Sequence, residues 1–146
     1  MTRYLVGVTF APGEDSTPMD RWEPQEVQAH LDHYSRLHEE LVARGELVES
    51  TILTGPDLAM VVRSDGTAPV VTTGPFTEFT EWLAGYQVVD VDSEQRAVEI
   101  AAAVSAVPGR GGRPTGQPVH LRRVMDDSPA DPQQMDAYLA TARGPA

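Results

Sequence analysis

Cysteine and lysine are both absent from the 146 residues, and each absence removes a set of chemistries. Without cysteine there is no disulfide, no thiolate zinc or iron–sulfur site and no cysteine nucleophile. All 11 basic residues are arginine, which excludes a lysine Schiff base and a phosphate-loop lysine. The motifs G-x-G-x-x-G, G-x-S-x-G and H-E-x-x-H do not occur. Catalysis would therefore depend on His, Asp, Glu, Tyr or Arg, and we expect no cofactor and no metal.

Long hydrophobic runs and positive charge are scarce as well. No window approaches the ~20 apolar residues of a membrane-spanning helix, and the first apolar run is too short for a signal peptide. The net charge of −11 and a pI near 4.6 disfavour nucleic acid and anionic membranes as partners. We therefore expect a cytoplasmic protein whose partner is a small-molecule substrate. The composition, 40% hydrophobic, is sufficient for one globular core.

Hydrophobic periodicity and turn signals predict an alternation of strands and helices. The expected strands cover residues 4–10, 46–54 (or an extended connector there), 58–63, 68–73, 85–91 and 119–125, and the expected helices cover 25–44, 77–83, 93–107 and 132–143. This order is that of a split βαβ, ferredoxin-like α+β sandwich with a four- to five-stranded antiparallel sheet. We expect one domain over residues 1–125 and a tail over residues 126–146 that contains the last helix.

Such a sheet buries one face under its helices and leaves the other face to be covered. A homodimer with the two sheets packed face to face is the simplest cover.

Residues 70–91, VVTTGPFTEFTEWLAGYQVVDV, resemble the signature of the YCII-related, or DGPF-domain, family. That signature is a strand, D-G-P-F, a short acidic helix, G-G-[YF] and a strand that ends in aspartate. Other matching segments occur in the same order, and the resemblance covers about residues 1–125. It implies a ferredoxin-like fold that dimerises as an α+β barrel. A His/Asp pair is proposed as the active site in the YciI branch, and lyase-type dehalogenation of hydroxylated aromatics is one activity associated with the family.

Three positions depart from the family pattern. Thr73 replaces the aspartate of D-G-P-F, so a carboxylate role does not transfer to this position. Ala84 replaces the first glycine of G-G-[YF]. Tyr34 stands where the YciI-type histidine is expected, and His33 is one residue away.

The candidate catalytic residues are His33, His30 and Tyr86. Imidazole is the side chain best suited to proton transfer near neutral pH, and both histidines belong to the helix expected at 25–44. One face of this helix is an apolar stripe formed by Val27, Leu31, Tyr34, Leu37, Leu41 and Val42. His33, at the edge of this stripe, is interpreted as a general acid or base at the mouth of a pocket. The alternatives are hydrogen-bonded or half-exposed helix histidines, or a metal-binding pair at i, i+3 spacing.

The candidate substrate-binding residues are Tyr34, Thr73, Gly74, Phe76, Trp82, His120 and Arg122. Backbone N–H groups near Gly74 could cradle an anionic oxygen, with a hydroxyl from Thr73. Trp82 could line an apolar pocket, while His120 and Arg122 share one face of a strand and suit an anionic substrate. The alternatives are a structural corner, core packing and an exposed edge. The loop at 110–116 has arginines among glycines but lacks the setting of a phosphate loop, so a flexible connector is expected.

Two functions are compatible with these residues. The first is a cofactor-independent enzyme that moves a proton on an aromatic or enone-like molecule, as a lyase, isomerase or cyclase. The alternative is a non-catalytic small-molecule binding or accessory module of the same fold. A histidine that contacts a carboxylate or tyrosine in a pocket would favour the enzyme.

Overall fold

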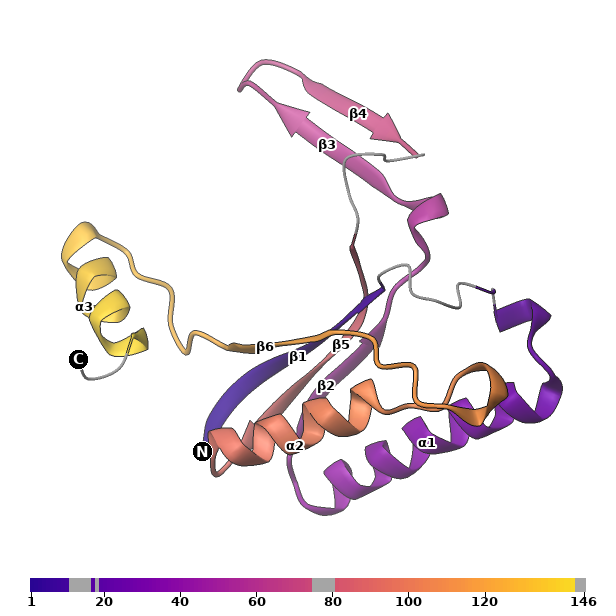
Figure 1. Cartoon of the computed structure of the whole chain (residues 1–146). Coiled ribbons are helices and arrows are strands. Elements are labelled where there is room, and N and C mark those ends of the chain that lie inside the picture. Colours follow the sequence, from indigo (N-terminus) through magenta and orange to yellow (C-terminus); the bar gives the residue numbers. More distant parts are fainter. Residues whose placement is uncertain (11–16, 18, 75–80, 144–146) are drawn as a thin grey trace.

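The computed structural model describes residues 1–10, 17, 19–74 and 81–143, and Figure 1 shows their arrangement. The strands are β1 (Thr2–Phe10), β2 (Leu47–Ile52), β3 (Met60–Ser64), β4 (Pro69–Thr73), β5 (Trp82–Val91) and β6 (Val119–Arg123). The helices are α1 (Pro24–Ala43), α2 (Glu94–Ser105) and α3 (Pro132–Ala142), with short 3-10 turns at Met19–Arg21, Pro56–Leu58 and Arg110–Gly112.

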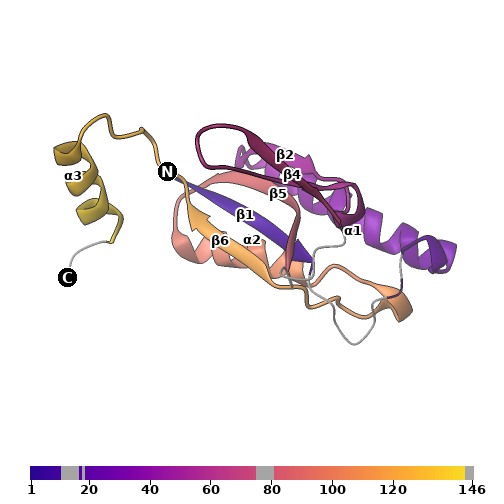
Figure 2. The same cartoon turned by 90° about the horizontal axis from the view of Figure 1, so that it is seen from above.

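Four strands form one antiparallel sheet in the order β2-β5-β1-β6. Helix α1 follows β1 in the chain and α2 follows β5. Both helices lie against the same face of the sheet (Figures 1 and 2). This arrangement confirms the predicted α+β, ferredoxin-like fold. We call the sheet face opposite these helices the open face.

Strands β3 and β4 form a separate two-stranded hairpin, which we call the arm. The Asp65-Gly66 turn closes it, and Gly66 has φ +99°, a backbone conformation that favours glycine. Figures 1 and 2 place the arm on the open-face side of the sheet. Helix α3 stands at the end of the segment that follows β6, where the sequence predicts a terminal helix.

Two sequence-based expectations were wrong. The helix expected at 77–83 does not include Trp82 and Leu83, which instead begin β5 because they pair with Phe10 and Thr9 of β1. Residues 77–80 lie outside the described residues. The 110–116 loop is tied down by backbone hydrogen bonds to the end of α2, including Gly116 N–H to the Ser105 carbonyl at 3.0 Å.

Both central helices begin where the sequence provides capping groups. Glu23 and Glu26 form a capping box at the start of α1, with Pro24 in the first turn. The Ser93 side chain accepts a hydrogen bond from the backbone of Arg96 at the start of α2. Between the helices and the sheet lies the core, whose largest fully buried side chains are Leu41, Ile100, Val6, Val89, Val91 and Val104.

A charged cluster joins the two helices to the sheet beside this core. Glu46 lies between α1 and β2 and is 6% exposed. Arg96 of α2 donates to both of its carboxylate oxygens, with the shortest contact at 2.9 Å, and Arg44 donates to it at 3.2 Å. The hydrogen bond from Arg96 holds the pKa of Glu46 below its usual value, against the opposing effect of burial. Arg96 also reaches Glu40 of α1 at 2.9 Å.

Replacing Arg96 with methionine is expected to destabilise the protein strongly. The substitution leaves the buried Glu46 carboxylate without its main partner, and removing one member of a buried ion pair costs roughly 3 kcal/mol. Urea unfolding at neutral pH measures the change. Glu99→Gln is the matched control, because Glu99 is an exposed partner of Arg96 at 3.5 Å, and its loss should cost at most about 1 kcal/mol.

The difference in unfolding free energy between wild type and Arg96→Met should also depend on pH. The pKa of Glu46 is depressed in the folded state, so the ion pair stabilises the protein fully above the unfolded value of about 4.3. This contribution is lost as the pH falls through the lower, folded pKa. The difference in unfolding free energy between wild type and Arg96→Met should therefore shrink in acid. A difference that stays constant from neutral pH to about pH 3 would contradict the assignment.

Candidate functional site

Two histidines of α1, His30 and His33, form hydrogen bonds to α2 or to the residues just after it. His33 donates from Nε2 to the carbonyl of Ala103 in α2 at 2.7 Å. His30 donates from Nδ1 to the carbonyl of Pro108, just beyond α2, at 2.9 Å. A carbonyl oxygen can only accept, so each contact fixes which ring nitrogen carries the proton. Both rings are half-buried and hold α1 against the C-terminal part of α2, which is the hydrogen-bonded alternative considered for them.

Tyr34 lies on the same side of the sheet as these histidines. Its ring centroid is 5.3 Å from that of His30 and 6.3 Å from that of His33, and it packs against the hydrophobic core. Burial raises the pKa of the Tyr34 hydroxyl, so the phenol stays protonated at neutral pH. The candidate residues of α1 therefore form one group within the helix layer.

A second group of candidate residues lies on the open face. Strand pairing places Thr51, Tyr86, Gly7 and His120 in one row across β2, β5, β1 and β6. Side chains alternate along a strand, and the neighbours of Tyr86 in β5, Gly85 and Gln87, are buried toward the helices. Tyr86 and His120 therefore project from the open face, on opposite sides of a glycine.

Each of these two side chains is paired with a carboxylate. The Tyr86 hydroxyl donates to Oε1 of Glu49 in β2 at 3.1 Å. The Nε2 atom of His120 lies 3.7 Å from Oε2 of Glu81, which precedes β5. Sequence reasoning missed both glutamates. Glu49 could have been found only from the register of β2 against β5, which the sequence does not give.

Because Gly7 has no side chain, no bulky group of β1 stands between Tyr86 and His120 in this row. A Cβ atom at Gly7 would lie 3.1 Å from a methyl group of Leu5 and 3.3 Å from one of Leu83. These contacts are tight, so glycine fits this position best. The surface between the two polar side chains is consequently an apolar floor, in which leucine side chains lie against the buried Gly7.

A second row on the open face runs beside the first. Glu49, Val88, Leu5 and Arg122 face one another across β2, β5, β1 and β6. The open face thus carries an acidic group at the β2 edge and a basic group at the β6 edge, with apolar side chains between them. Tyr86, His120 and Arg122, three of the residues singled out from the sequence, come together here.

The remaining candidates are dispersed. Thr73 and Gly74 are exposed at the end of the arm, and Trp82 is half-buried at the start of β5. Phe76 lies outside the described residues. The structure therefore separates the sequence-predicted residues into a helix-layer group, an open-face group and an arm group, and it does not bring His30 or His33 together with Tyr86.

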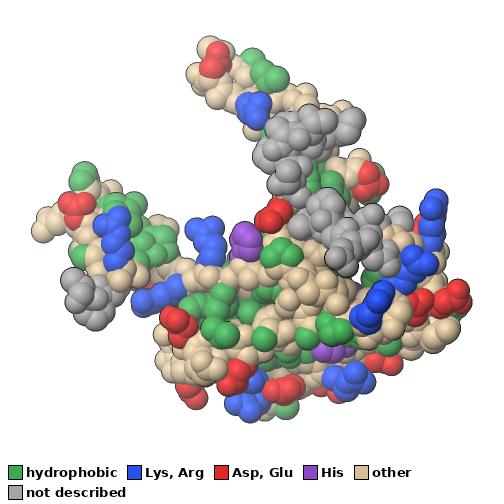
Figure 3. All heavy atoms as spheres, viewed as in Figure 1, with side chains coloured by type: hydrophobic (Ala, Val, Ile, Leu, Met, Phe, Trp, Pro, Cys, Tyr) green, Lys and Arg blue, Asp and Glu red, His purple; other side chains and the backbone are tan. Residues whose placement is uncertain are grey.

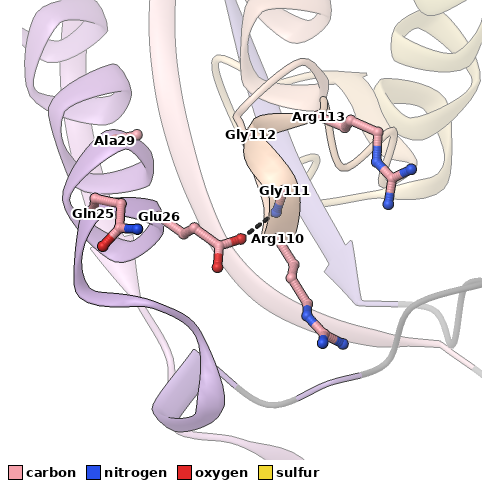
Figure 4. A pocket seen from close by; sticks show the side chains of 7 residues that line it. All are labelled: Gln25, Glu26, Ala29, Arg110, Gly111, Gly112 and Arg113. Carbon is pink, nitrogen blue, oxygen red and sulfur yellow. Dashed lines mark hydrogen bonds between the residues drawn. The ribbon is translucent and has the colours of Figure 1, made fainter.

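The pocket beside the 3-10 turn at Arg110–Gly112 is shown in Figure 4. It lies between the start of α1 and the turn and is lined by two arginines, which suggests an anion site at first sight. However, the Gly111 N–H donates to the Glu26 carboxylate, and Arg110 donates to the Thr17 hydroxyl at 2.9 Å. Two of the groups that would bind an anion, the Gly111 N–H and the Arg110 side chain, are thus already engaged within the chain.

A metal centre has no support in the part of the chain that the structure describes. No group of three or more His, Asp or Glu side chains there is arranged to hold a metal ion. Within the same residues, no helix is long and apolar enough to cross a membrane.

The fold and the open face define a ferredoxin-like α+β domain with polar groups on an uncovered sheet. Comparison with protein families matches residues 3–110 to the YCII-related domain, so the chain belongs to the YCII-related domain family. The matched region extends from β1 to the turn after α2. The search of curated proteins gives no significant match.

His30 and His33 of α1 are expected to occupy opposite neutral tautomers. The contacts predict a proton on Nδ1 of His30 and on Nε2 of His33. Long-range 1H–15N NMR spectra distinguish these forms at about pH 8.5, where an ordinary imidazole is neutral. His38, which is exposed on the same helix, is the internal control and should show no fixed tautomer. Identical averaged signals from all three rings would contradict the helix-clamping role.

Proposed function

We propose that the protein is a cofactor-independent enzyme that transfers a proton on a small aromatic or enone-like molecule bound to the open face. The reaction would be an elimination, isomerisation or cyclisation. The observation that supports this proposal is the row in which Tyr86 and His120 flank Gly7. Two groups able to exchange protons stand there about 10 Å apart between Cα atoms, the width of two strand spacings.

The carboxylates give each group a defined role. Oε2 of Glu81 lies 3.7 Å from Nε2 of His120, so it is placed to pair with the imidazolium that forms when His120 takes a proton from carbon. Glu49 accepts from the Tyr86 hydroxyl and fixes the position of the phenol oxygen. A ring lying over Gly7 and Leu5 would present one edge to the base and the other to the phenol.

Solvent deuterium exchange tests this function across a range of possible substrates. A panel of hydroxylated aromatics and enones is incubated with the protein in deuterated water, and label at carbon is measured by mass spectrometry. At least one compound should gain deuterium faster than in buffer. His120→Gln should slow this exchange about 100-fold or more, which is the usual contribution of a general base. His38→Gln, an exposed substitution on α1, should leave it unchanged.

Other outcomes decide between the remaining interpretations. Loss of exchange in His33→Gln, with full exchange in His120→Gln, would show that the catalytic base lies on α1. That result would overturn the proposal. If no compound exchanges but compounds shift the NMR signals of His120 and Tyr86, the protein is a binding module. That result would favour the non-catalytic alternative, which the hydrogen-bonded state of His30 and His33 already supports.

A second copy of the chain is proposed as the cover of the open face. The arm is its main support, because Met60, Val62 and Val71 form an apolar patch on one side of the hairpin and are 66%, 60% and 53% exposed. An isolated two-stranded hairpin is only marginally stable in water, so this patch needs a partner. The arm lies on the open-face side, where a second sheet would pack (Figure 1).

Val62→Glu should therefore weaken self-association. A charge in the middle of the apolar patch must be desolvated in the dimer, whereas it stays in water in the monomer. Sedimentation equilibrium should give twice the 15.8 kDa chain mass for wild type and a shift toward monomer for the variant. Val98→Glu, at an exposed position on α2, is the matched control and should remain dimeric. A monomeric wild type would overturn the proposed cover.

A further inference from the structure

Arg122 is a strongly charged group of the open face that the proposed reaction does not use. Arg122 is exposed on β6. Its guanidinium makes no ion pair within the part of the chain that the structure describes. The nearby Arg3 of β1, by contrast, pairs with Asp126 at 3.3 Å. In a chain with a net charge of −11, Arg122 thus places an unpaired positive charge next to the candidate reaction site. In Figure 3, arginine side chains and a histidine gather near β6 on the face shown.

The position of Arg122 relative to the proposed reacting groups is set by the strand. His120 is two residues earlier on β6, so both side chains project from the same face about 6.6 Å apart along the strand. Leu5 is the register partner of Arg122 on β1, and Val88 is the next residue in that row. An apolar floor therefore begins directly beside the guanidinium and continues toward Gly7.

None of the acidic side chains of the open face pairs with Arg122 among the described residues, and Asp90 of β5, which projects from the same face, is the register partner of Arg3. Glu49 is at the opposite edge of the sheet, where it accepts from Tyr86. Glu81 lies beside His120. A guanidinium binds carboxylates through two parallel N–H donors, and a single arginine next to an apolar floor suits a flat ring with one negative charge.

We infer that the open face selects organic acids, with Arg122 binding the carboxylate of a flat aromatic or enone carboxylic acid. The ring lies over Leu5 and Gly7, and its reactive carbon faces His120. This inference rests on the proposed function for the reacting groups and adds the class of substrate. Arg122 is then a substrate-binding residue that determines specificity and takes no part in the proton transfer.

The test compares benzoate with benzamide, which has the same shape and no charge. Each compound is titrated into the full-length protein while the NMR signals of His120 and Tyr86 are followed. Benzoate should shift both signals and bind about tenfold or more tightly than benzamide, the usual effect of a charge-assisted hydrogen bond. Arg122→Gln should weaken benzoate binding by a similar factor and leave benzamide binding unchanged.

Arg123→Gln is the matched control. Arg123 is exposed on the same strand and projects to the other face, so its loss changes the net charge equally but should leave the benzoate affinity as it is. Equal affinities for benzoate and benzamide, or equal losses in Arg122→Gln and Arg123→Gln, would overturn the inference. Binding of neither compound would also overturn it. Deuterium exchange abolished by His120→Gln shows separately whether the proposed function stands.

Discussion

The register of β1 between β5 and β6 is the constraint on which the rest of the structure depends. Because side chains alternate along each strand, this register decides which residues enter the core and which project from the open face. Val6 and Val89 turn toward the helices and are fully buried. The same pairing places Tyr86, Gly7 and His120 in one row on the other side. A shift by one residue would exchange the core for the candidate site.

The helix layer gives the histidines most suggestive in the sequence a structural role. A neutral imidazole has one N–H donor, and His30 and His33 each donate theirs to a backbone carbonyl of the facing segment. Such a bond contributes about 1 kcal/mol to stability. Together with the Glu46–Arg96 ion pair near the other end of the helices, these contacts hold α1 and α2 in place against the sheet. Tyr86, His120 and Arg122 of the open face take no part in these helix contacts.

Local signals were sufficient to predict most of the elements, and their order was sufficient for the fold. The helix expected at 25–44 and the strands expected at 58–63 and 68–73 depend on signals within a few residues, so α1, β3 and β4 were predicted closely. Periodicity was less reliable for individual faces, since Leu31 and Val42 fit the apolar stripe of α1 but are 50% and 56% exposed. The pairing of Tyr86 with Glu49 joins residues 37 positions apart through the strand register. Contacts of that kind are tertiary and leave no local trace in one sequence.

The central claim is that ligands bind on the open face and not between the helices. A crystal structure of the wild-type protein grown with benzoate tests it most directly. We predict ligand density over Gly7 and Leu5, with the carboxylate at Arg122 and the ring between Tyr86 and His120. Density beside His30 and His33, with an empty open face, would contradict this claim.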